Sequence, residues 1–300
     1  MNSQKARLND YNEYLLHKGY KKGTVDRYIK ELLLYFESVK QPLSQETYTR
    51  YLKELTSKMK ISSVKRIQSV LNNFYNFLYG TKLEIIIYDQ MQQQTIEYIS
   101  KDDLLKLINS IKTSSNYIGE KEYKIKKILL DRNTTIVVLM GKYGLSLREI
   151  SELNMNQINF HKCYISLANQ TIHILREDMD CLYRYYMSIP SVLRPFRDVS
   201  KPVFVSFDNI RMTYSWSYEN DEPKRLTDKA IQKLVKKEAR YAGIPAISAQ
   251  SLRNTAIIES LKQGKTSEEI KKEFRLTSVH AVNRYKRAIK NKKSENNLKD

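Results

Sequence analysis

Lysine and arginine are the residues of this sequence whose chemistry is clearest. The 300 residues contain 52 of them against 33 aspartates and glutamates, which leaves a formal net charge of +19 at pH 7. So large an excess requires an anionic partner, and the planar guanidinium of arginine suits bidentate contact with phosphate. The basic residues gather at a few places: Lys21 and Lys22 with Arg27, Lys65 with Arg66, Arg225 with Lys229, and Lys286 with Arg287.

The sequence contains no motif for a metal or redox site and no segment typical of a membrane span. Cys163 and Cys181 lie too far apart for a CxxC motif and are too few for a disulfide framework, so we interpret both as packing residues. No apolar run reaches the length of a bilayer, and the N-terminus lacks the apolar core of a secretory signal. We therefore expect a soluble cytoplasmic protein that binds no membrane, no cofactor and no metal.

The first part of the chain predicts a small helical bundle. Amphipathic stretches recur up to about residue 80, as where Val25, Ile29 and Leu32 follow helical spacing. Four helices are expected over residues 1–81. Gly80 and the polar run 90–94 break the pattern and predict an interdomain linker over 82–96.

Residues 97–290 mix helices with short strands. Ser100 and Asp103 fit a capping box before an apolar helix. Helices are expected over 132–142, 227–242, 250–263, 267–274 and 279–289, and strands over 158–160, 164–167 and 171–175, the last two joined as a hairpin. The fold class is therefore mainly α with a small β-sheet, in two domains, followed by a disordered basic tail over 291–300.

Four short motifs carry a resemblance to a known family. They are Tyr98-Ile99-Ser100-Lys101-Asp102-Asp103-Leu104, then Gly144-Leu145-Ser146-Leu147-Arg148-Glu149, then Gln250-Ser251-Leu252-Arg253-Asn254-Thr255, and finally Tyr285, 32 residues after Arg253. Together they resemble the tyrosine recombinase (phage integrase) family over nearly the whole chain. The resemblance implies an N-terminal core-binding (SAM-like) helical domain that clamps DNA, and an integrase-like C-terminal domain in which a tyrosine hydroxyl attacks a DNA phosphate.

The sequence departs from the family's pattern at most positions that carry this chemistry. The resemblance places the first arginine at Ser146, the two histidines of the later box at Gln250 and Asn254, and a further histidine or tryptophan at Leu276. The hairpin that should present a lysine reads Ala168-Asn169-Gln170, and Arg148 lies about 200° around a helix from Ser146. Only Arg253 and Tyr285 remain of the usual set.

These replacements predict that strand cleavage is lost. Removing one charge-stabilising donor costs about 10²–10³ in rate, and removing general acid or base help costs about 10²–10⁴ more. Such losses are not simply additive, but several together should extinguish the reaction. Ser146 and Glu149 also form an S-x-x-E capping box, which explains a serine there without catalysis. DNA affinity should survive, because it comes from many Lys and Arg side chains.

We therefore interpret the chain as a sequence-specific double-stranded DNA-binding regulator that does not cut DNA and could self-associate on it. It resembles the recombinase-derived repressors of SPβ-type Bacillus phages, which implies a phage repressor that maintains lysogeny. The side chains expected at DNA are Lys21, Lys22, Arg27, Lys65, Arg66, Arg225, Lys229, Arg253 and Lys286.

Two other functions stay open. One is an active recombinase with Tyr285 as nucleophile, in which Arg148, Lys162 and His280 supply the missing groups. The other is an accessory DNA protein without sequence preference, for which the ratio of specific to non-specific affinity would be near one.

Overall fold

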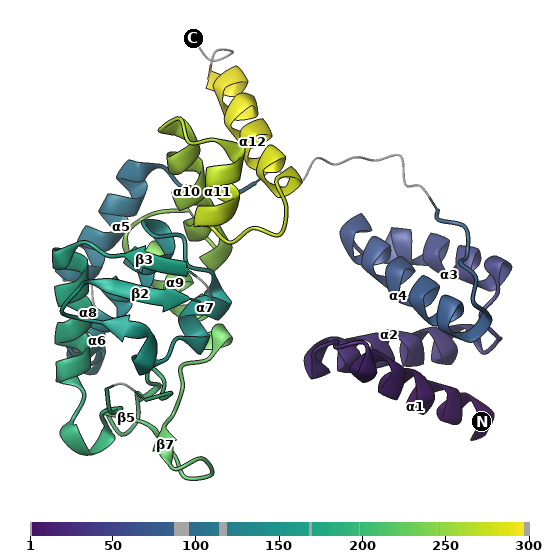
Figure 1. The fold of residues 1–300 in the computed structure, drawn as a ribbon, viewed down its shortest axis with the longest axis horizontal. Helices are drawn as coiled ribbons and strands as arrows, with labels where there is room; N and C mark the ends of the chain where they lie inside the picture. Colours follow the sequence, from purple (N-terminus) through teal and green to yellow (C-terminus); the bar gives the residue numbers. More distant parts are fainter. Residues whose placement is uncertain are drawn as a thin grey trace. The chain divides into compact units, whose positions relative to one another are not determined.

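The chain folds into two units, Met1–Gln93 and Gln94–Asp300, in a computed structural model (Figure 1). The structure describes residues 2–86, 96–113, 119–167, 170–197, 199–245 and 247–296. Helices dominate both units, and the strands form small antiparallel sheets in the second, so the predicted fold class is confirmed. Within the described residues, no helix combines the length and apolar character needed to cross a membrane.

Four helices build the N-terminal unit, as the sequence predicted: α1 (Asn2–His17), α2 (Lys22–Val39), α3 (Gln45–Lys58) and α4 (Ile61–Tyr79). Their apolar faces enclose a core rich in aromatic rings. Tyr11 packs edge-on against Phe74, with ring centroids 4.9 Å apart, and its hydroxyl donates to Asn73 at 2.7 Å. Because the hydroxyl has a partner, a tyrosine can occupy this fully buried position.

The first residues of the expected linker pack against the N-terminal unit. Leu83 is 5% exposed and belongs to that unit's core. The side chain of Asn72 binds both the N–H and the carbonyl of Leu83, each at 3.0 Å. The buried Leu83 side chain and two hydrogen bonds to its backbone thus hold this segment on α4. Residues 87–95 of the expected linker lie outside the described part of the chain.

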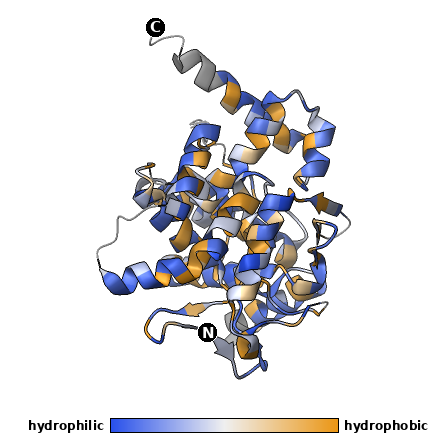
Figure 2. Cartoon of the chain, turned by 90° about the vertical axis from the view of Figure 1, so that its left-hand side faces the viewer, coloured by the Kyte–Doolittle hydropathy of each residue, from blue (hydrophilic) through white to orange (hydrophobic). Residues whose placement is uncertain are grey.

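Eight helices are described in the C-terminal unit: α5 (Lys101–Thr113), α6 (Glu120–Gly141), α7 (Leu147–Glu152), α8 (Arg176–Ser188), α9 (Asp228–Tyr241), α10 (Ala249–Lys262), α11 (Ser267–Glu273) and α12 (His280–Asn296). The N-cap half of the capping box that we predicted before α5 is confirmed, since Ser100 Oγ accepts from the Asp103 N–H at 3.0 Å; the Asp103 carboxylate accepts from the Ser100 hydroxyl at 2.7 Å and not from its backbone N–H. Hydrophobic and hydrophilic residues alternate along the helices (Figure 2), as amphipathic packing requires. Helix α6 is buried on all sides from Arg132 to Gly141 and lies at the centre of the unit.

Three small antiparallel sheets complete the unit. Strands β1 (Ile158–Asn159), β2 (Tyr164–Leu167) and β3 (Gln170–His173) pair in that order, with Ile165 opposite Ile172. The tip of the β2–β3 hairpin, residues 168 and 169, lies outside the described residues. Strands β4 (Phe207–Asp208) and β5 (Thr213–Tyr214) form one pair, and β6 (Trp216–Ser217) and β7 (Glu222–Pro223) form another.

The C-terminal end of the chain corrects one prediction. We expected disorder over 291–300, but α12 continues to Asn296. The reason is that each further residue adds a hydrogen bond to a helix that already exists. Residues 297–300 lie outside the described part. The first half of α12 packs with α10 and α11 in a separate apolar cluster that includes Ile257, Phe274 and Tyr285.

Candidate DNA-binding site

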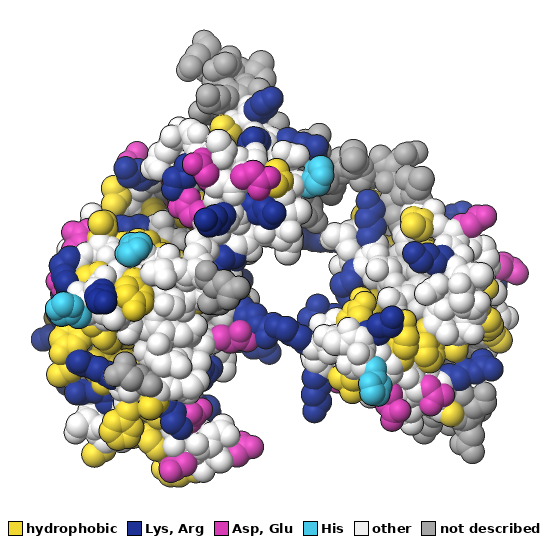
Figure 3. All heavy atoms as spheres, in the orientation of Figure 1, with side chains coloured by type: hydrophobic (Ala, Val, Ile, Leu, Met, Phe, Trp, Pro, Cys, Tyr) yellow, Lys and Arg dark blue, Asp and Glu magenta, His cyan; other side chains and the backbone are white. Residues whose placement is uncertain are grey.

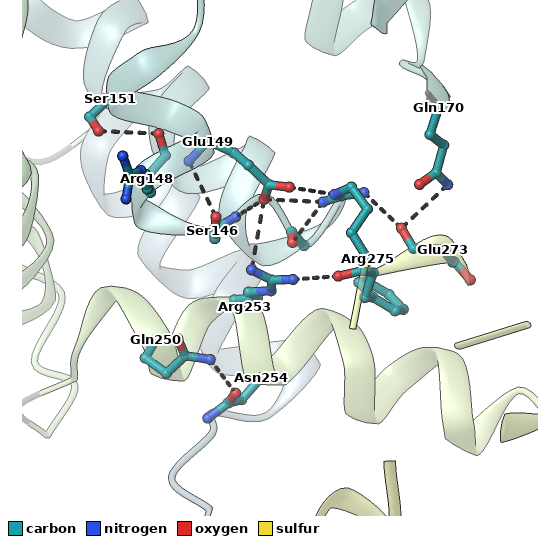
Figure 4. Close-up of polar contacts among 12 residues, drawn as sticks. Ser146, Arg148, Glu149, Ser151, Gln170, Gln250, Arg253, Asn254, Glu273 and Arg275 are labelled. Atoms are coloured by element: carbon teal, nitrogen blue, oxygen red, sulfur yellow. Dashed lines mark hydrogen bonds and ion pairs between the residues drawn. The ribbon is translucent and has the colours of Figure 1, made fainter. Parts of the chain in front are cut away.

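Ser146, where the resemblance predicts an arginine, is the N-cap of helix α7. Its Oγ accepts from the Glu149 N–H at 3.2 Å, and Glu149 Oε2 accepts from the Ser146 N–H at 2.6 Å. The predicted capping box is therefore confirmed. Its consequence is that the carboxylate of Glu149 is fixed at the N-terminus of α7, where it faces Arg253 and Arg275 (Figure 4).

Arg275, which the sequence analysis did not single out, binds this carboxylate. Its Nε donates to Glu149 Oε1 and its Nη2 lies 3.3 Å from Glu149 Oε2. Nη2 also lies 3.4 Å from the Gly144 carbonyl, and Nη1 donates to the Glu273 carbonyl at 2.7 Å. Burial raises the pKa of Glu149, but the hydrogen bonds from Arg275 and from the Ser146 N–H outweigh burial and hold this pKa below its usual value.

The backbone at Arg275 has an uncommon conformation. Arg275 follows α11 with φ +53°, the left-handed region where a helix usually ends with glycine. The turn also packs tightly against the residues before α7, because a Cβ on Gly144 would come within 2.3 Å of the Phe274 ring. Gln170 reaches the same turn from the β2–β3 hairpin, with its Nε2 3.5 Å from the Glu273 carbonyl.

Arg253 lies beside this pair on helix α10. Its side chain is only 13% exposed, and its Nη1 lies 3.7 Å from Glu149 Oε2. Its Nη2 donates to the Phe274 carbonyl. Burial lowers the pKa of Arg253, and the nearby Glu149 opposes that effect. A partly desolvated guanidinium of this kind is well suited to bind an anion such as phosphate.

Two amides and a tyrosine form a second polar network on the other side of α10. Gln250 Nε2 donates to Asn254 Oδ1 at 2.8 Å, and Asn254 Nδ2 donates to the Glu97 carbonyl at 2.9 Å. Tyr285 is fully buried, and its hydroxyl donates to Asn254 Oδ1 at 3.2 Å and accepts from Arg284 at 2.8 Å. Asn254 thus holds the tyrosine hydroxyl inside the protein, and Gln250 bonds to Asn254.

The residues proposed to replace the missing groups lie elsewhere. Arg148 points away from the cluster (Figure 4) and pairs with Glu152 at 2.7 Å. Lys162 and His280 are exposed. Leu276 packs against the apolar cluster around Tyr285. Among the described residues, the hydrogen-bond partners of the Tyr285 hydroxyl are Asn254 and Arg284.

The other basic residues expected at DNA lie on several elements. Lys21, Lys22, Arg27, Lys65, Lys229 and Lys286 are exposed. Figure 3 shows Lys and Arg side chains on the visible face of both units. Arg66 pairs with Glu31 at 2.6 Å. Arg225 is half-buried and donates to the Ser151 and Leu153 carbonyls at 2.9 and 3.2 Å, so its internal bonds support the loop after α7.

A surface pocket of about 500 Å³ opens beside the Glu149–Arg275 pair. Its lining consists of Glu149, Glu152, Asn154, Gln157, Leu167, Arg225 and Arg275. The pocket gives solvent access to the pair. The described residues contain no group of His, Cys, Asp or Glu side chains arranged to hold a metal ion.

The structure is similar to several solved structures, although the sequence matches no protein-family model and no curated protein. XerH site-specific recombinase bound to palindromic difH substrate has a TM-score of 0.67 and 12% identity, covering 91% of this chain and 78% of that one. Tn1549 transposon integrase in complex with circular intermediate DNA has a TM-score of 0.65 and 14% identity, covering 93% and 94%. A lambda integrase dimer bound to a COC' core site has a TM-score of 0.60 and 13% identity, again covering 93% and 94%.

The chain has the tyrosine recombinase fold. Identities this low relate the folds, so the role of each side chain rests on its own contacts. Within the tyrosine recombinase fold of this chain, the cations Arg253 and Arg275 meet at Glu149, while the Tyr285 hydroxyl is bonded to an amide.

Proposed function

We propose that this protein is a sequence-specific double-stranded DNA-binding regulator that occupies DNA without cutting it. The buried hydroxyl of Tyr285 is the observation that carries the proposal. A nucleophilic hydroxyl must reach the phosphorus atom and must pass its proton to a base. The oxygen of Tyr285 is enclosed, and its acceptor is the amide of Asn254, which is not a useful base at neutral pH.

The charge of the chain supports DNA as the partner. The formal net charge of the chain is +19, and both units carry exposed lysines and arginines. Neutralisation of phosphates by such side chains releases counterions, so the affinity should fall steeply with salt. The XerH, Tn1549 and lambda structures were solved with DNA, and by analogy we assign duplex DNA to this chain.

The biological role that fits binding without cleavage is repression. A protein that stays on its site without breaking a strand can exclude RNA polymerase from an overlapping promoter. We propose a phage or prophage repressor that maintains lysogeny and acts in the bacterial cytoplasm, with bound copies that self-associate on DNA.

Two measurements on the full chain test the proposal. Footprinting on genomic fragments should find discrete sites in promoters, bound much more tightly than competitor DNA. Suicide DNA substrates that carry such a site should give no covalent adduct. An adduct that forms with the wild-type chain and is lost in Tyr285→Phe would establish an active recombinase instead. Equal affinity for all duplexes would indicate an accessory DNA protein.

A further inference from the structure

We propose that Arg275 is a positioning residue that keeps Arg253 available for a DNA phosphodiester by engaging the carboxylate of Glu149. The inference rests on the proposed function, since it takes DNA as the ligand. It assigns a role to a residue that lies outside the motifs of the sequence, and it explains how one carboxylate can lie next to Arg253 without neutralising it.

The three side chains share their contacts unequally (Figure 4). Arg275 binds both oxygens of Glu149, whereas the nearest nitrogen of Arg253 lies 3.7 Å from Oε2, beyond hydrogen-bond distance. All three are mostly buried, with side-chain exposures of 13% for Arg253, 16% for Arg275 and 22% for Glu149. With two positive charges and one negative charge, the cluster keeps an excess positive charge.

The nitrogen atoms of the two arginines are used differently. A guanidinium carries five N–H donors on three nitrogens. In Arg275 all three nitrogens already donate, to Glu149, Gly144 and Glu273. In Arg253 only Nη2 makes a hydrogen bond to a described residue, to the Phe274 carbonyl. Arg253 therefore keeps Nε and Nη1 for an incoming anion, and Arg275 has little donor capacity left.

The turn after α11 links both arginines mechanically. Phe274, which accepts from Arg253, directly precedes Arg275 in the chain. The Arg275 side chain ties this turn to the N-terminus of α7 through Glu149 and Gly144. If Arg275 were removed, Glu149 would have Arg253 as its nearest cation. We expect the carboxylate to close the 3.7 Å gap and occupy the donors that a phosphate would use.

The experiment compares the affinity of full-length variants for one footprinted duplex at fixed salt, by fluorescence anisotropy. Arg275→Gln and Arg253→Gln should each weaken binding about tenfold, because a charge-assisted phosphate contact is lost in both. Arg275→Lys keeps a cation for Glu149 and should bind more tightly than Arg275→Gln. Arg211→Gln, which removes an exposed arginine from the β4–β5 turn, is the charge-matched control and should change little.

Substitution of Glu149 separates positioning from a merely structural role. Glu149→Gln alone should bind DNA at least as well as the wild type, and Glu149→Gln combined with Arg275→Gln should recover most of the lost affinity. A structural role predicts the reverse, because Glu149→Gln removes an ion pair and part of the α7 cap. Unchanged binding by Arg275→Gln, or no recovery in the double variant, overturns the inference. Failure of the wild-type chain to bind any duplex would instead refute the proposed function.

Discussion

Replacing Arg275 by glycine or by alanine should separate backbone strain from side-chain chemistry. Both substitutions remove the guanidinium, and the loss of its hydrogen bonds to Glu149 should cost about 1.5–3 kcal/mol of the free energy of unfolding. Glycine also relieves the left-handed backbone at φ +53°, where an L-residue costs about 1–2 kcal/mol. We therefore expect Arg275→Ala to show the full loss of about 1.5–3 kcal/mol relative to the wild type, and Arg275→Gly to recover about 1 kcal/mol of it.

DNA affinity should not follow this difference in stability. Glycine and alanine both leave Glu149 without its partner, so both variants should weaken binding to the same extent. Urea denaturation gives the free energies of unfolding, and anisotropy with a labelled duplex gives the affinities. Two results would refute the reasoning. Equal stability of the two variants would mean that the turn carries no strain, and an affinity that rises with stability would mean that Arg275 acts only by holding the fold.

Three further predictions concern other residues. Tyr285→Phe should lower the free energy of unfolding by about 1–3 kcal/mol, since the hydrogen bonds of its hydroxyl with Asn254 and Arg284 are both lost while Asn254 keeps Gln250, and DNA affinity should stay unchanged in the anisotropy assay. The pKa of Glu149 in the folded state lies below its ordinary value of 4.5, so Glu149 stabilises the fold above pH 4.5 and this contribution is lost as the pH falls through the folded-state pKa. Urea denaturation at acid pH should therefore show a smaller loss of the free energy of unfolding in Arg275→Gln than in the wild type. Lys21→Gln and Lys65→Gln should each reduce the slope of log affinity against log salt by about 1, whereas Lys53→Gln on α3 serves as the matched control and should leave it unchanged.

Local rules were sufficient to predict several parts of the structure. A serine three residues before a glutamate predicted the start of α7, and the structure has that capping box. Helical spacing of apolar residues predicted the four helices of the first unit and α9 to α11. These features depend on neighbours in the sequence, and the hydrogen bonds and periodicity that decide them can be read from a few residues.

The contacts that matter most at the site could not be predicted in this way. Arg275 and Glu149 are 126 residues apart, and nothing local indicates that the turn after α11 packs against the N-terminus of α7. Tyr285 reaches Asn254 only because α12 packs on α10. The strands β4 to β7 are two residues each, which is too short for an alternating pattern to show. Helix α12 continues to Asn296, beyond residue 290 where we expected the ordered part of the chain to end.

The positions at which the family resemblance predicts catalytic groups are held by contacts of their own. Ser146 caps α7, Gln250 and Asn254 bond to each other, and Leu276 packs in the cluster that buries Tyr285. Buried polar groups must be satisfied, and here Gln250 satisfies Asn254 while Ser146 is satisfied by Glu149. Restoring one histidine or arginine would therefore break an existing network before it supplied a catalytic group. Arg275 already binds both carboxylate oxygens of Glu149. An arginine at position 146 would therefore add a third cation next to one carboxylate. The contacts around these residues thus hold Tyr285 as part of the core, as the proposed binding without cleavage requires.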